Sequence, residues 1–173
     1  IMQVLRARPQ YSRLVAMLEG GELGDLLSKD GPYTIFAPTD EAWDNIDEEY
    51  KDYLEDKEFV QQLLKKHVIK GSLCCAGVMN SHQGLWRSRE TTLHPSLHLS
   101  VNKGSHGDVV VGSDNQAVTQ CDLTATNGVV HAMDRLITDA FPRRRHRSHR
   151  GRKWNQSIRE YLEKRFSEPF NWQ

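Results

Sequence analysis

The first seventy residues of the chain place their hydrophobic positions at helical spacing. Leu14 and Leu18 fall on one face of a predicted helix, and the same spacing recurs over residues 22–28. A third pattern starts at Asp56, repeats every four residues and continues to Gly71, a residue type that commonly ends a helix. This half of the chain is therefore predicted to be mainly helical.

The second half changes to alternation of apolar and polar residues. Alternating or apolar runs over residues 97–102, 108–111 and 117–123 are separated by turns that contain glycine. They predict a three-strand antiparallel meander, and residues 129–137 come next as the most apolar strand of this half. Helices followed by strands, rather than regular alternation of the two, predict an α+β protein.

Residues 33–43 form a strand-to-helix corner between the early helices and the third helical pattern. Phe36 suits a buried strand, and Pro38 cannot donate a ladder hydrogen bond, so the strand is expected to stop there. Thr39 can cap the following helix, whose first turn then holds acidic residues that favour the helix dipole. These residues are therefore expected to shape the fold rather than to bind a ligand.

Three sequence blocks, in this order and spacing, resemble one known family. They are Thr-Ile-Phe-Ala-Pro-Thr-Asp-Glu-Ala-Trp at 34–43, Leu-Leu-Lys-Lys-His-Val-Ile at 63–69 and Ala-Thr-Asn-Gly-Val-Val-His-Ala-Met-Asp-Arg-Leu-Ile at 125–137. They resemble the first signature, the central histidine segment and the second signature of the fasciclin domain. The resemblance covers about residues 1–138 and implies an α+β wedge, in which a small antiparallel β-sandwich has helices packed on one side. It also implies a non-enzymatic adhesion or protein-interaction module.

Seven residues of these blocks are expected to build the domain rather than to bind a partner: Phe36, Pro38, Thr39, His67, Asn127, Gly128 and His131. His67 could be a ligand or a partner contact, but its place on the inward face favours a core histidine bonded to backbone groups. His131 lies in a buried strand and is interpreted in the same way. We also expect Ile35 and Val130 to lie close together in the core, with His67 between or beside them.

The resemblance implies two further features. Animal adhesive members of the family use an acidic–aliphatic pair just before the second signature, and Asp122-Leu123 stands at that place as the expected partner-binding pair. Those members also use a Tyr-His pair in the central segment, where this chain has Lys66 before His67. The chain departs from the adhesive pattern there, and it contains no Arg-Gly-Asp tripeptide.

The formal net charge of zero hides an asymmetry along the chain. Residues 1–142 hold 13 Lys and Arg against 20 Asp and Glu, whereas residues 143–173 hold 10 against 3. Seven of those basic residues cluster together: Arg143, Arg144, Arg145, Arg147, Arg150, Arg152 and Lys153. Such a segment cannot bury itself, so we expect a fasciclin domain over 1–140, a basic linker over 141–153 and a helical extension over 154–173. The linker is expected to bind a sulfated glycan, an anionic lipid or RNA phosphate.

The chain has three cysteines, Cys74, Cys75 and Cys121. A bridge from Cys121 to either of the other two suits a secreted protein, and free buried thiols suit any other location equally well. The cysteines could form a metal site only together with nearby histidines, namely His82, His94 and His98. The spacing of these residues does not match that of zinc ligands. We therefore expect no metal and no other cofactor. The chain also lacks a nucleophile elbow and a phosphate-binding glycine loop, so no enzymatic activity is expected.

Two functions remain as hypotheses. The first is an adhesion module, secreted or at the cell surface, that binds protein partners through surface loops near Asp122-Leu123 and anionic partners through its basic tail. The alternative is a structural accessory subunit of a large organellar or membrane assembly, anchored by the C-terminal extension.

No apolar run approaches the ~20 residues of a membrane-spanning helix. The acidic run between Asp44 and Asp56 is interpreted as a solvated helix face, or otherwise as a patch for a basic partner. Because the chain begins with Ile1, we expect a fragment or a processed product.

Overall fold

The computed structural model of the protein describes residues 1–46, 48–80, 87–94 and 98–137. The chain divides into two compact units, Ile1–Ala140 and Phe141–Gln173. The second unit, which contains the predicted basic linker and helical extension, lies outside the described residues.

Short helices make up most of the first half. They are α1 (Met2–Arg6), η1 (Pro9–Tyr11), α2 (Ser12–Leu18), α3 (Glu22–Ser28), α4 (Asp40–Asp44), α5 (Glu48–Lys51), η2 (Asp52–Glu55), α6 (Lys57–Lys66) and, later in the chain, α7 (Cys75–Asn80). The helix α6 begins after Asp56, whose carboxylate accepts hydrogen bonds from the backbone N–H groups of Glu58 and Phe59. None of the described helices is long and apolar enough to cross a bilayer.

The strands form one seven-stranded sheet in the order β2-β1-β7-β6-β5-β4-β3. They are β1 (Tyr33–Pro38), β2 (Val68–Lys70), β3 (Arg87–Thr91), β4 (His98–Lys103), β5 (Val109–Val111), β6 (Gln116–Ala125) and β7 (Gly128–Met133). The predicted antiparallel meander is confirmed as β4-β5-β6. Neighbouring strands are antiparallel except β1 and β7, which are parallel and far apart in the sequence.

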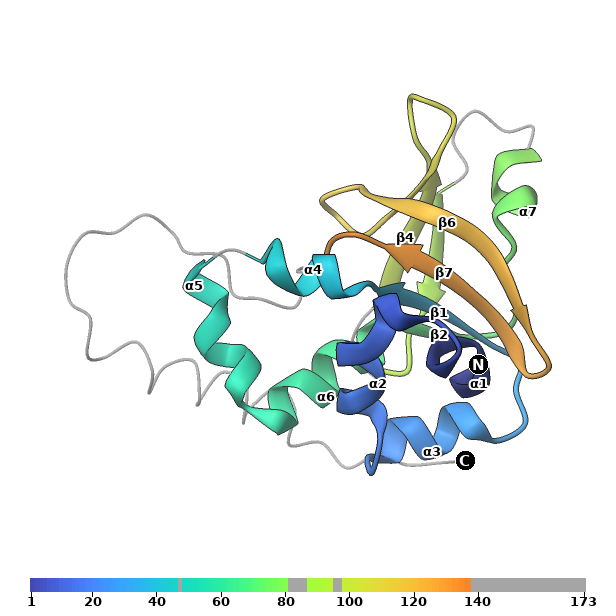
Figure 1. Cartoon of the computed structure of the whole chain (residues 1–173). Coiled ribbons are helices and arrows are strands. Elements are labelled where there is room, and N and C mark those ends of the chain that lie inside the picture. The colour runs from blue at the N-terminus through green and yellow to red at the C-terminus, as the bar shows by residue number, and fades with distance from the viewer. Residues whose placement is uncertain (47, 81–86, 95–97, 138–173) are drawn as a thin grey trace, which may run out of the picture. The chain divides into compact units, whose positions relative to one another are not determined.

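The sheet folds back until its two ends nearly meet. A bridge pairs Ile69 with Thr92, and the N–H of Leu93 donates to the carbonyl of Val68 at 2.8 Å. A core then lies between the two halves of the sheet, with residues from β1 and β7 on one side and from β4 and β5 on the other: Phe36, Met133, Leu99, Val101, Val109 and Val111. The helices α1, α2, α3 and α6 gather on one side of the sheet, and α7 lies apart from them (Figure 1). The predicted α+β fold is thus confirmed, with two facing halves of one sheet forming the sandwich.

The strand β1 is central to this arrangement. Both faces of its interior are buried: helices cover one face, and the core between the two halves of the sheet covers the other. Ile35 pairs with Val130 in register, and the two side chains are fully buried, which confirms that the two signature strands are neighbours.

The prediction that the third helix continues to Gly71 is wrong. The helix α6 ends at Lys66, and residues 68–70 form β2 against β1. Val68 and Ile69 are β-branched and suit a strand. Their hydrogen-bonded pairing with the edge of β1 that β7 does not occupy favours a strand over the helix that the spacing predicts. The sequence patterns also did not predict β3 or α7.

Candidate partner-binding site at the β6 bulge

The strand β6 carries two irregularities where it pairs with β7. Between the pairs Gln120–Ala132 and Leu123–Val130, β6 advances by three residues while β7 advances by two. The extra residue bends the strand, as in a β-bulge. Asp122 adopts a left-handed conformation there, with φ of 58°. Aspartate tolerates this region better than most residues do.

Three hydrogen-bonding groups of Asp122 differ in their partners. Its backbone N–H donates to Nδ1 of His131 at 3.1 Å, and its Oδ1 atom accepts from the backbone N–H of Cys75 at 2.9 Å. Its Oδ2 atom makes no hydrogen bond to any residue in the described ranges. One carboxylate oxygen of this half-buried residue is therefore fixed by Cys75, and the other makes no hydrogen bond within the described residues.

His131 anchors the bulge from within the core. The side chain is about 1% exposed, and its ring centroid lies 5.4 Å from that of Phe36. Its Nε2–H donates to the carbonyl of Leu73 at 2.7 Å, which leaves Nδ1 as the acceptor for Asp122. Burial lowers the pKa of His131, although the bond to Leu73 and the charge of Asp122 act in the opposite direction. Because burial is the larger effect, the neutral form of the ring is favoured.

A disulfide ties the same region together. Cys75 and Cys121 are bonded, with Cα atoms 5.9 Å apart, across 46 positions of sequence. The sequence left open whether Cys121 forms a bridge and with which cysteine; in the structure it bonds Cys75, and Cys74 is an exposed free thiol. The bridge joins the start of α7 to the residue next to Asp122.

The described part of the chain holds one group of three side chains close enough for a shared metal ion, namely Cys75, Cys121 and His131. Both sulfur atoms are engaged in the disulfide, so the group offers no thiolate ligand. His94 is buried and His98 is exposed, and neither joins such a group; His82 lies outside the described residues.

Leu123, the second residue of the predicted pair, is half-buried and pairs with Val130. The pair lies within β6, as the predicted strand over residues 117–123 requires, at a bulge rather than in the exposed loop that the binding hypothesis expected.

The β6–β7 turn is held by Asn127 and Gly128. The side-chain amide of Asn127 donates to the carbonyls of Leu27 and Lys29 at 2.8 and 2.7 Å. Gly128 has φ of 147°, and a Cβ atom at this position would lie 1.8 Å from the carbonyl oxygen of Tyr33. The turn thus joins the end of α3 to the start of β1.

His67 lies beside the paired strands β1 and β7 and contacts residues of both signatures. Its Nδ1 atom bonds to the carbonyl of Leu63 at 2.9 Å, and its Nε2 atom accepts from the N–H of Ile137 at 3.1 Å. Its own carbonyl accepts from the N–H of Phe36 at 2.9 Å. Lys66, which stands where adhesive relatives are expected to carry a tyrosine, is also buried. Neither side chain is exposed to a partner.

The strand-to-helix corner contacts β7 at Pro38 and Thr39. Pro38 pairs with Met133 at the end of β1, and the N–H of Thr39 donates to the carbonyl of Met133 at 2.8 Å. Thr39 occupies the N-cap position of α4, but its side chain makes no capping hydrogen bond.

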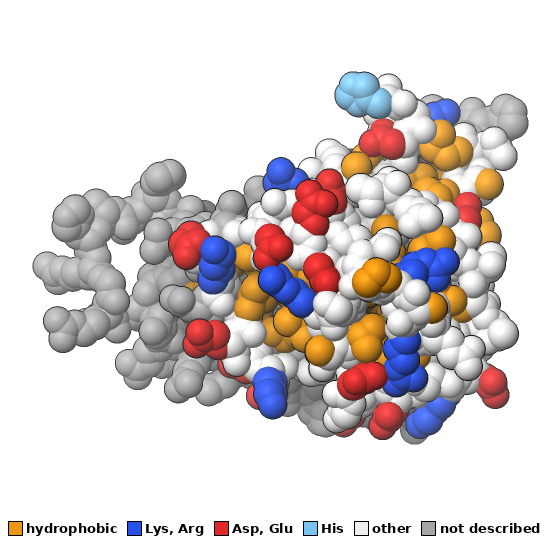
Figure 2. All heavy atoms as spheres, in the orientation of Figure 1, with side chains coloured by type: hydrophobic (Ala, Val, Ile, Leu, Met, Phe, Trp, Pro, Cys, Tyr) orange, Lys and Arg blue, Asp and Glu red, His pale blue; other side chains and the backbone are white. Residues whose placement is uncertain are grey.

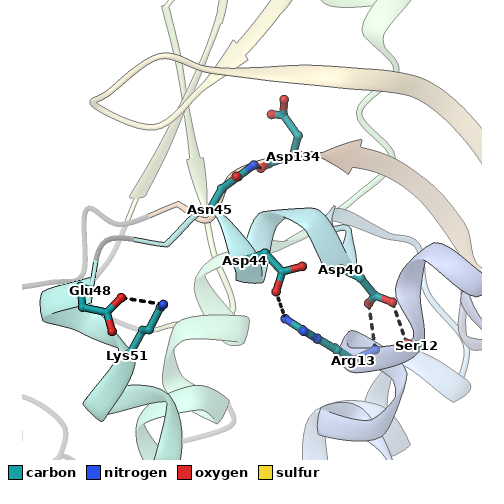
Figure 3. Close-up of polar contacts among 8 residues, drawn as sticks. All are labelled: Ser12, Arg13, Asp40, Asp44, Asn45, Glu48, Lys51 and Asp134. Carbon is teal, nitrogen blue, oxygen red and sulfur yellow. Dashed lines mark hydrogen bonds and ion pairs between the residues drawn. The ribbon is translucent and has the colours of Figure 1, made fainter.

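The acidic residues of α4 are partly paired with α2. Asp40 accepts from the hydroxyl of Ser12 at 2.6 Å and from the N–H of Arg13 at 3.0 Å, and the guanidinium of Arg13 meets Asp44 at 2.7 Å (Figure 3). Lys51 and Glu48 form a further pair at 2.6 Å. On the face shown in Figure 2, acidic and basic side chains are interspersed. These contacts support the interpretation of a solvated helix face.

Residues 73–75 contribute to the site, although no sequence pattern indicated them. The Leu73 carbonyl, the Cys75 N–H and the Cys75 sulfur all contact the bulge, yet they lie more than forty positions before it. The three cysteines were the one signal in the sequence, and they allowed a bridge from Cys121 to Cys74 or Cys75 without requiring one. The seven basic residues at 143–153 lie outside the described residues.

Comparison with known proteins identifies the class of this chain. The family model of the fasciclin domain matches residues 9–139, and the chain therefore belongs to the fasciclin domain family. It is 31% identical over 138 residues to transforming growth factor-beta-induced protein ig-h3 of Sus scrofa, a match that covers 79% of this chain and 19% of the relative. It is 29% identical to protein sll1483 of Synechocystis, with 79% of this chain and 72% of the relative covered.

A solved structure gives the same result. The chain matches a FAS1 domain pair from the insect cell adhesion molecule fasciclin I with a TM-score of 0.61 and 27% identity, over 78% of this chain and 45% of that one. The chain spans about a fifth of the length of ig-h3, whose match covers 19% of that protein.

Proposed function

We propose that this fasciclin domain is a non-enzymatic adhesion-type module, which binds a protein partner through the surface at the β6 bulge. The observation that carries the proposal is the state of Asp122, whose backbone is fixed by His131 and whose Oδ2 atom remains unbonded within the described residues. A rigid carboxylate with one unsatisfied oxygen suits a charge-assisted hydrogen bond from a partner. Leu123 adds an adjacent, half-buried apolar contact.

The proposed location is the cell surface or the extracellular space. The Cys75–Cys121 disulfide supports it, because such bonds persist in oxidising compartments. The structural relative fasciclin I is by its title a cell adhesion molecule, which supports the same location. These two observations favour the secretory route over an organellar assembly.

The basic segment at 143–153 is proposed to bind a sulfated glycan. Seven positive charges in eleven residues attract any polyanion through the release of its counterions. For a protein at the cell surface or outside the cell, we choose sulfated glycans as the polyanion, because anionic lipid and RNA phosphate belong to other compartments.

The partner-binding surface is tested with Asp122→Asn in the full chain. Asparagine keeps an Oδ1 acceptor for the Cys75 N–H and tolerates the left-handed backbone, so only the charge is removed. Attachment of cultured fibroblasts to surfaces coated with the variant is expected to need about tenfold more protein, since an interfacial charge is worth on the order of 1.4 kcal/mol or more.

Glu41→Gln is the matched control, because Glu41 is exposed on α4 and loses the same charge away from the bulge. Equal attachment by wild type, Asp122→Asn and Leu123→Ala, with unchanged melting temperatures, would overturn the partner-binding surface. A loss with Glu41→Gln alone would assign binding to the acidic helix face instead.

The glycan proposal is tested on a heparin column. Replacing Arg143, Arg144 and Arg145 by glutamine is expected to lower the salt needed for elution. The control neutralises three exposed cations of the domain: Lys29, Lys103 and Arg135. Unchanged elution for the first triple variant would refute glycan binding by this segment, and retention on anionic vesicles but not on heparin would assign it to lipid.

A further inference from the structure

The bulge depends on one protonation state of His131. The ring meets a carbonyl, which can only accept, at Nε2, and a backbone N–H, which can only donate, at Nδ1. Only the neutral ring with its proton on Nε2 satisfies both partners. A second proton would place an N–H group of the ring against the N–H group of Asp122.

The groups around His131 determine when that proton binds. From β6 it faces the Asp122 carboxylate, from β1 the ring of Phe36, and from the start of α7 the sulfur of Cys75 at 3.6 Å. The disulfide does not titrate, so Asp122 is the charged group that acts on the ring among the described residues. Burial outweighs the attraction of Asp122 and lowers the pKa of His131, which keeps the ring neutral near pH 7.

Protonation removes one of the contacts that hold the extra residue of β6. The proton comes from solvent and forms an N–H bond at Nδ1, and the hydrogen bond from the Asp122 N–H is lost. Asp122 then loses the support for its left-handed backbone, which is otherwise unfavourable for a residue with a side chain. If β6 relaxes by one residue, every side chain near the bulge changes face.

We propose that acidification switches off the partner-binding surface by protonating His131, which releases the Asp122 bulge while the Cys75–Cys121 disulfide keeps α7 attached. This regulation rests on the function proposed for Asp122 and Leu123. It fits an adhesive contact that is made at neutral pH and released in an acidic compartment. Because one proton is taken up, the released population rises by up to about tenfold for each unit of pH.

The test follows backbone amide resonances of the isotope-labelled full chain by NMR between pH 7.5 and 5. The Asp122 amide and the Cys75 amide are expected to shift together, with the midpoint of the His131 ring itself. In His131→Gln, which carries a donor and an acceptor but does not titrate, the two amides are expected to stay constant. His98→Gln, at an exposed histidine, is the control and keeps the wild-type titration.

Constant Asp122 and Cys75 amides in the wild type across this range would overturn the switch. A normal titration in His131→Gln would overturn it as well, because another group would be responsible. If His131→Gln does not fold, long-range proton–nitrogen spectra of the wild-type ring decide: a ring that stays in the neutral Nε2–H form at pH 5 refutes the proposal.

A second experiment measures fibroblast attachment at pH 7.4 and at pH 6. At each pH, attachment to the wild type is divided by attachment to His131→Gln. The ratio is expected to fall on acidification. If the amides titrate as expected but Asp122→Asn attaches normally at pH 7.4, the conformational switch stands and the partner-binding function fails.

Discussion

Gly128 is the position where a single added methyl group is expected to do the most damage. It begins β7 directly beside Tyr33, the first residue of β1, in the parallel pair that brings the two signatures together. Its φ of 147° is in a region that residues with side chains rarely adopt, and a Cβ atom would lie 1.8 Å from the Tyr33 carbonyl oxygen. The Gly128→Ala change therefore introduces backbone strain and a clash with main-chain atoms.

The magnitude results from these two effects. The backbone conformation costs about 1–3 kcal/mol for a residue other than glycine. The clash cannot be relieved by a side-chain rotation, so β1 must move and weaken the hydrogen bond from the Tyr33 N–H to the Asn127 carbonyl, now 3.1 Å long. A lost backbone hydrogen bond adds about 1 kcal/mol. We expect the free energy of unfolding to fall by about 3 kcal/mol or more, a large share of a typical domain's stability.

Urea denaturation followed by tryptophan fluorescence and circular dichroism measures this change. Gly77→Ala is the control, since Gly77 lies within α7 and an added Cβ there meets no atom within 4 Å. That variant is expected to gain about 0.5–1 kcal/mol from helix propensity. A Gly128→Ala protein within about 1 kcal/mol of wild type would refute the close approach of β1 and β7.

Three further predictions concern stability. Asp56→Ala removes the cap of α6 and is expected to cost about 1 kcal/mol in urea denaturation, whereas Asp56→Asn retains most of it; equal losses would contradict capping. Replacing Cys75 and Cys121 by serine opens a bridge across 46 positions and is expected to cost up to about 4 kcal/mol by chain entropy; a loss below about 1 kcal/mol would mean that the bridge adds little. Because burial lowers the pKa of His131, the unfolded chain binds a proton more tightly, so stability is expected to fall as the pH drops below 6.5 towards the lowered pKa. Thermal melts at pH 7.4 and 5.5 should show a smaller shift for His131→Gln, and an equal shift would assign the acid sensitivity elsewhere.

The sequence predicted much of the fold because its signals are local. Helical spacing over residues 22–28 became α3, and the alternation of Leu99 and Val101 with polar residues became β4. Pro38 ends β1, as its missing donor predicts. The error at α6 came from the same kind of signal, because the four-residue repeat continues through His67 while the chain itself turns into β2. Pairing with β1 is a contact between distant residues, and no local pattern contains it.

By itself the sequence determined the class of the fold, the family, the proximity of the two signatures and the choice of Asp122 and Leu123 as candidate binding residues. Only the tertiary structure decided that Asp122 lies on a bulge, that Cys75 rather than Cys74 bonds Cys121, and that His131 binds the Asp122 N–H and the Leu73 carbonyl. The physical reason is distance along the chain. Periodicity, caps and turn residues act over a few positions, whereas the bulge is assembled from β6, β7 and the start of α7, which meet only after the sheet has folded.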